Sequence, residues 1–335
     1  MLSLSTSWNS ARHKSGSGII AEIRALGFES VELNFRLTRP VVEEIAELAG
    51  SGVVKVSSLH NMCPLPDGIP PAEASPDYYS LSSPDAAERR LAVSAAKVTV
   101  DYAAKLGAEA VVLHTGRIPV KDHTRRLASL IGDEGRFSAL RDRMRAERDA
   151  HKGGCLESVI MSLSELVPYA EGSGVRLGVE NRYYYSEIPV MEEMESLFGR
   201  FKKGLLYYWH DVGHAEVFER LGLIRHKDLL ERFSDRLIGV HLHDIIGPVT
   251  DHAAPGQGTF DFSIVKPYLK SGTIKVLEVH EPATSEDIIK GVACLKKALG
   301  KALLPSGIQQ SRASFTLDPG TRYFASWNPL SIRMP

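Results

Sequence analysis

One segment of the chain combines histidines and carboxylates at spacings that suit a metal site or an acid–base site. An apolar run that starts at Leu237 ends in His241-Leu-His243-Asp244. Side chains two residues apart on a strand share a face, so we expect His241 and His243 to point the same way. A lone histidine in such a place is often a hydrogen-bonded core residue. Three ligand-capable residues within four positions, with His252 soon after, favour a functional site instead.

The residues that follow Asp244 are rich in Gly and Pro and include Asp251-His252 and Pro255-Gly-Gln-Gly258. Such residues neither continue a strand nor start a helix easily, so we expect a loop at the C-terminal end of the strand. An α/β barrel carries its functional groups on the loops at this end of its strands.

Eight short β-forming runs alternate along the chain with segments of helical periodicity. The expected strands are residues 1–7, 28–33, 53–59, 109–114, 175–180, 205–211, 237–243 and 274–279. The expected helices are residues 18–26, 41–49, 84–106, 156–171, 190–201, 226–233 and 285–299. Eight such units predict an α/β fold, a (β/α)8 TIM barrel. No Gly-x-Gly-x-x-Gly follows the first strand, which disfavours a dinucleotide-binding sheet.

Ligand-capable residues recur at the ends of these strands. Six of the eight ends carry a histidine or a carboxylate: His60, His114, Glu180, Asp211, His241 and Glu278. His214 follows Asp211 by three residues, so the turn after that strand could bring both toward one site. Oxygen and imidazole ligands without thiolates suit a divalent ion such as Mn²⁺, Zn²⁺, Co²⁺ or Mg²⁺.

Each of these residues also has a purely structural interpretation. Glu180 could pair with Arg182, and Asp211 could cap the turn that follows it, which is a common role of Asp. The histidines at the third and fourth strand ends could bond the backbone. A carboxylate that closes an apolar strand is costly to bury unless it is paired or metal-bound, and this cost favours a ligand role for Glu180 and Glu278.

The composition is that of a globular protein with a substantial core, since 43% of the 335 residues are hydrophobic and 24% are charged. The formal net charge of −1 offers no overall attraction to nucleic acid. No apolar run of eighteen residues and no secretory leader is present, so we expect a cytoplasmic protein without a membrane partner. The three cysteines, Cys63, Cys155 and Cys294, are widely separated and predict neither disulfides nor a Cys-rich zinc site.

Two regions exceed what a minimal barrel needs. Residues 61–83 form a Pro-rich loop after the third strand, and residues 117–154 form a long insertion after the fourth. The insertion holds a mixed charged run, 141–149, and ends in Gly153-Gly154. The run predicts either a solvated helix face or a lid over the site.

We expect the barrel domain to span residues 1–300 and an irregular C-terminal extension to span residues 301–335. The extension lacks apolar periodicity. It could dock on the barrel or on a neighbouring subunit through its aromatic residues Phe315, Tyr323, Phe324 and Trp327.

These motifs, taken in order, resemble the xylose-isomerase-like barrels. That superfamily includes sugar isomerases and epimerases of the tagatose-epimerase type, and it is related to the endonuclease IV family. The resemblance covers roughly residues 1–300 and rests on His60; Leu113-His114-Thr-Gly116; Val179-Glu180-Asn181; His210-Asp211-Val-Gly-His214-Ala215; His241-Leu-His-Asp244; Asp251-His252 with Pro255-Gly-Gln-Gly258; and Leu277-Glu278.

The epimerase branch implies a divalent metal ion as the cofactor. The resemblance leaves open whether further ions bind beside it. By resemblance, its ligands are Glu180, Asp211, His241 and Glu278. His241 is implied rather than His243 because the family's His-x-x-acid pattern is completed here by Asp244. In that branch the two glutamates also face each other across the substrate and act as acid and base. The residues implied to orient the ligands are Asn181, Arg182, His243 and Asp244.

The endonuclease branch carries three zinc ions and additional histidines. Those histidines match His60, His114, His214 and His252, which in an epimerase would contact the substrate or a further metal. The acid that the endonuclease branch has two residues before the last histidine is replaced here by Thr250, and Asp251 is out of step.

The resemblance therefore implies an isomerase or epimerase of a small sugar or sugar derivative. The metal would stabilise an enediolate while one glutamate removes a proton and the other returns it. The alternative is an endonuclease IV-like zinc phosphodiesterase acting on abasic-site DNA, which needs a basic groove-binding face. The charge balance favours a small-molecule sugar over nucleic acid as the partner, and a homo-oligomer is compatible with both. A barrel that only binds a sugar would leave the strand-end ligands without a role.

Overall fold

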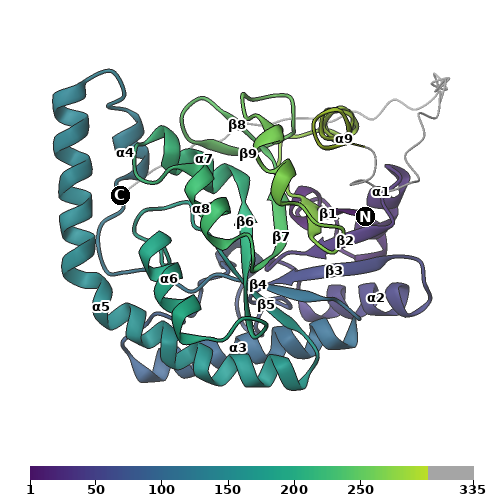
Figure 1. The fold of residues 1–335 in the computed structure, drawn as a ribbon. Coiled ribbons are helices and arrows are strands. Elements are labelled where there is room, and N and C mark those ends of the chain that lie inside the picture. The colour runs from purple at the N-terminus through teal and green to yellow at the C-terminus, as the bar shows by residue number, and fades with distance from the viewer. Residues whose placement is uncertain (301–335) are drawn as a thin grey trace, which may run out of the picture.

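The eight apolar runs form eight parallel strands in the computed structural model, which describes residues 1–300 (Figure 1). They close into a barrel in the order β1-β10-β7-β6-β5-β4-β3-β2. The predicted (β/α)8 barrel is therefore confirmed. The barrel strands are β1 (Leu2–Ser5), β2 (Ser30–Leu33), β3 (Lys55–His60), β4 (Ala110–Leu113), β5 (Arg176–Glu180), β6 (Leu206–Asp211), β7 (Leu237–Leu242) and β10 (Ile274–Leu277).

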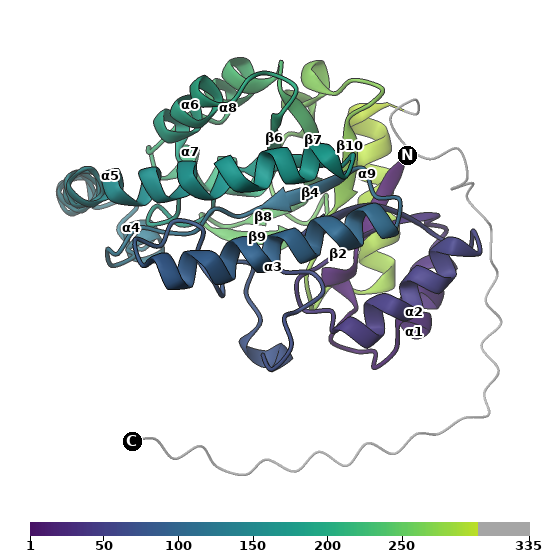
Figure 2. The ribbon, with the colours of Figure 1, turned by 90° about the horizontal axis from the view of Figure 1, so that it is seen from below.

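Helices surround the barrel, and α3 packs against α5 (Figure 2). All seven expected helices are present, whereas α4 and α7 were not predicted. The helices are α1 (Gly16–Ala25), α2 (Arg39–Gly50), α3 (Ala86–Lys105), α4 (Thr124–Ala128), α5 (Glu134–Gly172), α6 (Met191–Arg200), α7 (Val212–Arg220), α8 (His226–Phe233) and α9 (Ser285–Leu299). Short 3₁₀ helices cover Thr6–Trp8, Pro71–Glu73, Phe262–Ile264 and Lys266–Tyr268.

The same strand faces supply part of the core and the candidate site. Val112, Trp209 and Val276 belong to one buried cluster. The candidate functional residues that follow them by two positions are His114, Asp211 and Glu278. Alternation along a strand therefore places the functional groups directly above this cluster. Trp209 fits because β7 has a glycine opposite it: a Cβ at Gly239 would lie 2.2 Å from the Trp209 ring.

The long helix α5 joins the predicted insertion to the barrel. The sequence predicts that Gly153-Gly154 ends the insertion and that a helix begins at residue 156, but one helix runs from Glu134 to Gly172. A Cβ added at either glycine would meet nothing within 4 Å, so both lie in open space and only weaken the helix. The helix changes direction along its course (Figures 1 and 2), and glycine pairs are among the usual causes of such bends.

The charged run 141–149 lies in the first half of α5. Its charged side chains are exposed or half-buried, as expected for a solvated helix face, except for Arg148, which is 1% exposed. The Arg148 guanidinium donates to the backbone oxygens of Tyr185 and Glu187 and pairs with Glu193. The solvated interpretation is therefore wrong for Arg148, and the lid interpretation stays a prediction.

A two-stranded antiparallel hairpin follows β7 where the sequence predicts only a loop. It consists of β8 (Asp244–Ile246) and β9 (Thr250–Ala253). Within residues 1–300, no helix is long and apolar enough to cross a membrane. The predicted extension 301–335, with its four aromatic residues, lies outside the described residues.

Candidate functional site

Asp211 lies at the junction of β6 and α7 and serves both elements. Its Oδ1 accepts a hydrogen bond from His214 N (2.7 Å) and so caps α7. Its Oδ2 lies 3.6 Å from His241 Nδ1. The sequence leaves helix capping and metal ligation as alternative roles for Asp211. In the structure, one carboxylate caps α7 and also lies among the candidate ligands. Because α7 starts directly after the strand, His214 also lies at this end of the barrel.

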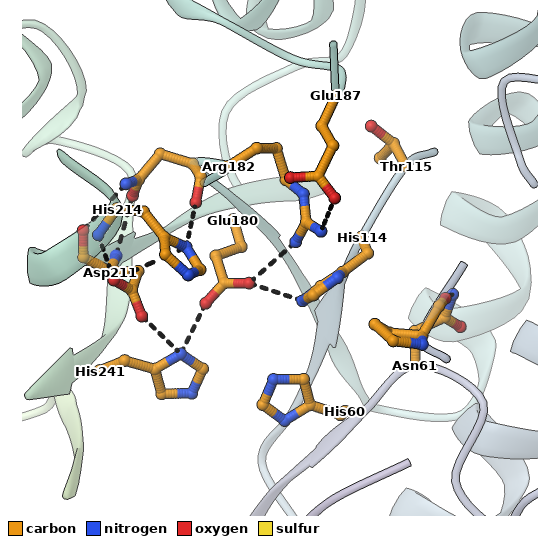
Figure 3. Close-up of polar contacts among 12 residues, drawn as sticks. His60, Asn61, His114, Thr115, Glu180, Arg182, Glu187, Asp211, His214 and His241 are labelled. Carbon is orange, nitrogen blue, oxygen red and sulfur yellow. Dashed lines mark hydrogen bonds and ion pairs between the residues drawn. The ribbon is translucent and has the colours of Figure 1, made fainter. Parts of the chain in front are cut away.

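The four residues implied as metal ligands meet at the C-terminal end of the barrel. Figure 3 shows three of them, Glu180, Asp211 and His241. One ligand atom from each of Glu180, Asp211, His241 and Glu278 lies within 4.8 Å of the others, and all four residues are buried. His241 Nδ1 is 2.6 Å from Glu180 Oε1 and 3.0 Å from Glu278 Oε2. Three carboxylates and one imidazole in this space form a donor set for a divalent ion.

His60 and His114 lie on one side of this central set. With Glu180 they form a second set whose ligand atoms are within 4.8 Å of one another. His114 Nε2 is 2.7 Å from Glu180 Oε2, yet neither nitrogen of the His114 ring makes a hydrogen bond of acceptable geometry within residues 1–300. A close approach without hydrogen-bond geometry is compatible with two ligands of one cation, so these donors fit a metal.

His214 and His252 lie on the other side and form a third set with Asp211. Asp251 is one position away from the acid that the endonuclease branch has in the sequence, but its side chain lies beside this third set. Its Oδ2 is 3.0 Å from His252 Nδ1 and 3.7 Å from His214 Nε2. The backbone of His252 is left-handed, with φ 56°, which is uncommon for a residue other than glycine. The hairpin thus supplies an acid on this side although Thr250 occupies the expected position.

His243 is held in one orientation behind Asp211. His252 N donates to His243 Nδ1 (2.9 Å), so the ring proton must be on Nε2, which lies 2.9 Å from Asp211 Oδ1. The His243 ring packs against Gly213, where an added Cβ would lie 2.0 Å from the ring. As expected, His241 and His243 turn toward the same carboxylate.

Asn181 and Arg182 also hold candidate ligands in place, whereas Asp244 does not. Asn181 donates to Asp211 O (2.9 Å) and accepts from Asp211 N (2.8 Å), which fixes the backbone at the strand end. Arg182 Nη1 donates to Glu180 Oε2 (3.2 Å). The Asp244 carboxylate instead accepts bonds from the backbone N–H groups of Ile245, Gly256 and Phe260, so it shapes the loop beside the site.

Three buried carboxylates near the site are absent from the set predicted from the sequence. Glu32 on β2 contacts His241 and His60. Asp77, in the loop 61–83, lies 3.5 Å from Arg182 Nη2, and Glu187 accepts from the same guanidinium (2.9 Å). The signal for Glu32 is a carboxylate inside the apolar run Val31-Glu32-Leu33. Loop residues such as Asp77 carry no periodicity, so their burial has no comparable signal.

The charges of the site are strongly coupled. Burial raises the pKa of a carboxylate, but at Glu180 and Glu278 the positive charge of His241 outweighs burial and holds the pKa well below its usual range. Burial lowers the pKa of His241, but Glu278 and Glu32 outweigh it and raise the pKa well above its usual value. A divalent ion would supply the positive charge that a protonated His241 otherwise provides.

A cavity of about 450 Å³ opens onto Glu180 and Glu278. Carboxylates and imidazoles line it together with Phe35, Arg36, Arg125, Tyr183 and Tyr184. A cavity of this size and polarity suits a small molecule with several hydrogen-bonding groups.

The sequence matches the family described as xylose isomerase-like TIM barrel over residues 20–298, and the chain belongs to that family. An uncharacterised protein of Sinorhizobium fredii, y4fM, is 29% identical over 217 residues, which are 65% of this chain and 59% of that protein. The chain therefore spans about three fifths of the length of this curated relative.

Solved structures share the fold. A D-tagatose 3-epimerase-like protein superposes with a TM-score of 0.63 at 20% identity, covering 89% of this chain and 96% of that one. The IOLI protein with a bound zinc atom superposes with a TM-score of 0.59 at 14% identity, covering 89% and 97%. At these identities the likeness concerns the barrel fold.

Proposed function

We propose that the protein is a divalent-metal-dependent isomerase or epimerase of a small sugar or sugar derivative. The observation that carries this proposal is the central set, in which Glu180 and Glu278 both lie within about 3 Å of His241 Nδ1. One structural neighbour is a D-tagatose 3-epimerase-like protein, and this likeness supports the same class of reaction.

In this proposal, Glu180, Asp211, His241 and Glu278 hold the ion. A bound Mn²⁺, Zn²⁺, Co²⁺ or Mg²⁺ would stabilise the negative charge of an enediolate formed from the substrate. Glu180 ends β5 and Glu278 directly follows β10, and these two strands are not neighbours in the barrel. They therefore reach a bound sugar from different directions, and one takes the proton from carbon while the other returns it.

The remaining groups of the cavity would select and orient the sugar. His60, His114, His214 and His252 line it and can bond hydroxyl groups or hold a further ion. Arg182 fixes one oxygen of Glu180, which leaves the other oxygen toward His241. Tyr183 and Tyr184 also line the cavity, and aromatic rings can cover the apolar face of a sugar.

Solvent proton exchange tests this proposal. The metal-loaded protein is incubated in D₂O with a panel of ketoses and keto-sugars, and NMR follows the proton next to the carbonyl. We expect exchange on at least one sugar, and a loss of about 100-fold or more in Glu180→Gln and in Glu278→Gln. Glu216→Gln serves as the control. The Glu216 carboxylate lies on α7, bonds Arg220 and His226, and does not line the cavity.

The arrangement of the three donor sets also supports a second proposed function, an endonuclease IV-like zinc phosphodiesterase acting on abasic-site DNA, because neighbouring sets share a carboxylate. The second set (His60, His114 and Glu180) shares Glu180 with the central set, and the third set shares Asp211 with it. Three ions in such a row could activate water and stabilise the leaving oxygen of a phosphodiester. Three ions per chain and cleavage of an abasic-site duplex, with no exchange on any sugar, would reverse the order of the two proposals.

A further inference from the structure

Glu32 is a fully buried carboxylate that belongs to neither the ligand set nor the acid–base pair of the proposed function. It stands on β2 between Val31 and Leu33 and is 0% exposed. An ionised carboxylate in an apolar strand is costly unless donors surround it. Ser58 Oγ donates to Glu32 Oε2 (2.7 Å), and His241 Nε2 lies 3.0 Å and 3.1 Å from the two Glu32 oxygens.

The two nitrogens of His241 face different partners. Nδ1 faces Glu180, Asp211 and Glu278, and Figure 3 shows this nitrogen turned toward Glu180 and Asp211. Nε2 faces Glu32. An ionised carboxylate only accepts hydrogen bonds, so the Nε2 proton is held on the Glu32 side. In the neutral ring the Nδ1 lone pair then points into the central set.

His60 lies against the same carboxylate. Its ring is parallel to that of His241, with centroids 5.1 Å apart and planes 5° apart. His60 Nδ1 is 3.2 Å from Glu32 Oε1, while His60 Nε2 is 3.7 Å from Glu278 Oε1. One carboxylate therefore lies behind two imidazoles, and each imidazole presents its other nitrogen to the candidate ligands.

We propose that Glu32 is a positioning residue of the metal centre. By accepting the Nε2 proton of His241 it selects the tautomer that binds through Nδ1, and its negative charge strengthens that nitrogen as a ligand. Ser58 fixes the carboxylate in turn, so the chain Ser58–Glu32–His241 leads to the ion. The inference rests on the proposed function only in requiring that the centre binds a divalent ion.

Metal affinity of the full chain tests the role of Glu32. The variants are Glu32→Gln, Glu32→Asp and Ser58→Ala, with Glu216→Gln as the control, because Glu216 faces a histidine outside the centre (His226, 3.4 Å). The readouts are the Kd for Zn²⁺ and Co²⁺ by chelator competition, ions bound per chain, the visible spectrum of the Co²⁺ form, and the Tm of the metal-free protein.

We expect Glu32→Gln to raise the Kd by about 10–100-fold and to shift the Co²⁺ bands without changing the number of ions bound. Glu32→Asp should recover part of the affinity, and Ser58→Ala should weaken binding less than Glu32→Gln. Glu216→Gln should bind like the parent. If Glu32→Gln does not fold, the Kd values of Glu32→Asp and Ser58→Ala decide the question.

Two results would overturn the role of Glu32 and leave the proposed function standing. One is a parent-like Kd and Co²⁺ spectrum in all three variants. The other is the loss of a whole ion per chain in Glu32→Gln, which would make Glu32 itself a ligand, since Glu32, His60, His241 and Glu278 also lie within 4.8 Å. A parent that binds no divalent ion would overturn the inference and the proposed function together.

Discussion

Arg182 shows at the scale of one residue how the protein stabilises a buried charge. Its guanidinium is 4% exposed and faces Glu187 at 2.9 Å, Glu180 at 3.2 Å and Asp77 at 3.5 Å. These contacts bring together the β5 strand end, the loop that follows it and the loop 61–83. Each carboxylate offsets part of the cost of burying the guanidinium, and Arg182 offsets theirs.

We predict a pH-dependent stability loss for Glu187→Gln. Burial raises the pKa of Glu187, but the charge of Arg182 outweighs it and lowers the pKa below the usual 4.5. The pair therefore contributes fully at pH 7, and its contribution falls as pH drops below about 4.5 and through the folded-state pKa. In the metal-free protein we expect Glu187→Gln to lower the free energy of unfolding by about 3 kcal/mol at pH 7.

Urea unfolding of both proteins from pH 7 down to pH 3 measures this difference. It should shrink as the solution becomes more acidic. A difference that stays constant over the whole range would mean that the ionised form of Glu187 does not stabilise the fold.

Individual site residues were predictable where they end a strand. His114, Glu180 and Glu278 follow apolar runs, so their exposure to the barrel mouth could be deduced from alternation. Glu32 lies within such a run rather than at its end, and only its charge marks it. The place of Asp251 in the site could not be predicted, because the left-handed backbone of His252 that accommodates it cannot be deduced from residue types.

Helix α5 illustrates, at the scale of elements, how a surface helix fixes a loop at the site. Arg148 donates to the carbonyls of Tyr185 and Glu187, and the Glu187 side chain holds Arg182. The loop after β5 is therefore attached to α5 through main-chain oxygens, while Tyr183, Tyr184 and Glu187 of this loop line the cavity.

We predict that Arg148→Met destabilises the protein by about 3 kcal/mol or more, because it removes the buried cation paired with Glu193 and the donor to the backbone oxygens of Tyr185 and Glu187. Arg143→Met on the same helix is the matched control. Arg143 is 52% exposed and 3.5 Å from Glu147, so its loss should cost under about 1 kcal/mol. Urea unfolding of both variants measures the contrast, and equal losses would show that Arg148 is not the attachment point.

Alanine substitutions at two glycines should change the stability of the protein in opposite directions. Gly239→Ala would place a Cβ 2.2 Å from the buried Trp209 ring, so we expect a loss of about 1–3 kcal/mol. Gly153→Ala lies in open space within α5 and should stabilise the protein by roughly 0.5–1 kcal/mol. Thermal unfolding of both variants gives the sign, and a neutral Gly239→Ala would contradict the packing of Trp209 against β7.

The limits of prediction differ between elements. The strands were predictable because apolar runs bounded by polar residues recur eight times. Helix α7 was missed because β6 passes into it at Asp211-Val212 with no loop between them, and because Gly213 in its first turn weakens the helical pattern. The start of α5 was misplaced because Gly153-Gly154 usually marks a boundary, whereas here both glycines lie on an exposed face where they are tolerated.

At the scale of the whole molecule, most of the buried ionisable groups of residues 1–300 lie at one end of the barrel. Carboxylates from β2, β5, β6 and β10 converge there with imidazoles from β3, β7 and the segments after β4 and β6. Parallel strands in a closed barrel produce this convergence, since all their C-terminal ends lie on one rim. The alternation of strands and helices was enough to predict the barrel, but the three donor sets depend on side-chain directions that only the structure provides.

We predict that divalent ions raise the Tm of the intact protein and that a chelator lowers it. A ligand that binds only the folded state at a concentration of 100 Kd stabilises it by about 2.7 kcal/mol, which for a chain of this size corresponds to roughly 4 °C. Thermal unfolding after dialysis against chelator, then with Mn²⁺, Zn²⁺, Co²⁺ or Mg²⁺, measures the shift. Identical Tm values under all conditions would contradict a metal centre, and Glu180→Gln should reduce the response.

The continuity of α5 also restricts how the length of this region can vary among relatives. Ser158 and Ser162, on the second half of the helix, face the barrel side, and Ser162 Oγ donates to Leu81 O (2.8 Å). Each residue inserted or deleted between Arg148 and Ser158 would rotate Arg148 by about 100° and move it by about 1.5 Å. Length changes should therefore occur before Arg148 in the chain, where neither the helical phase nor the loop after β5 is affected.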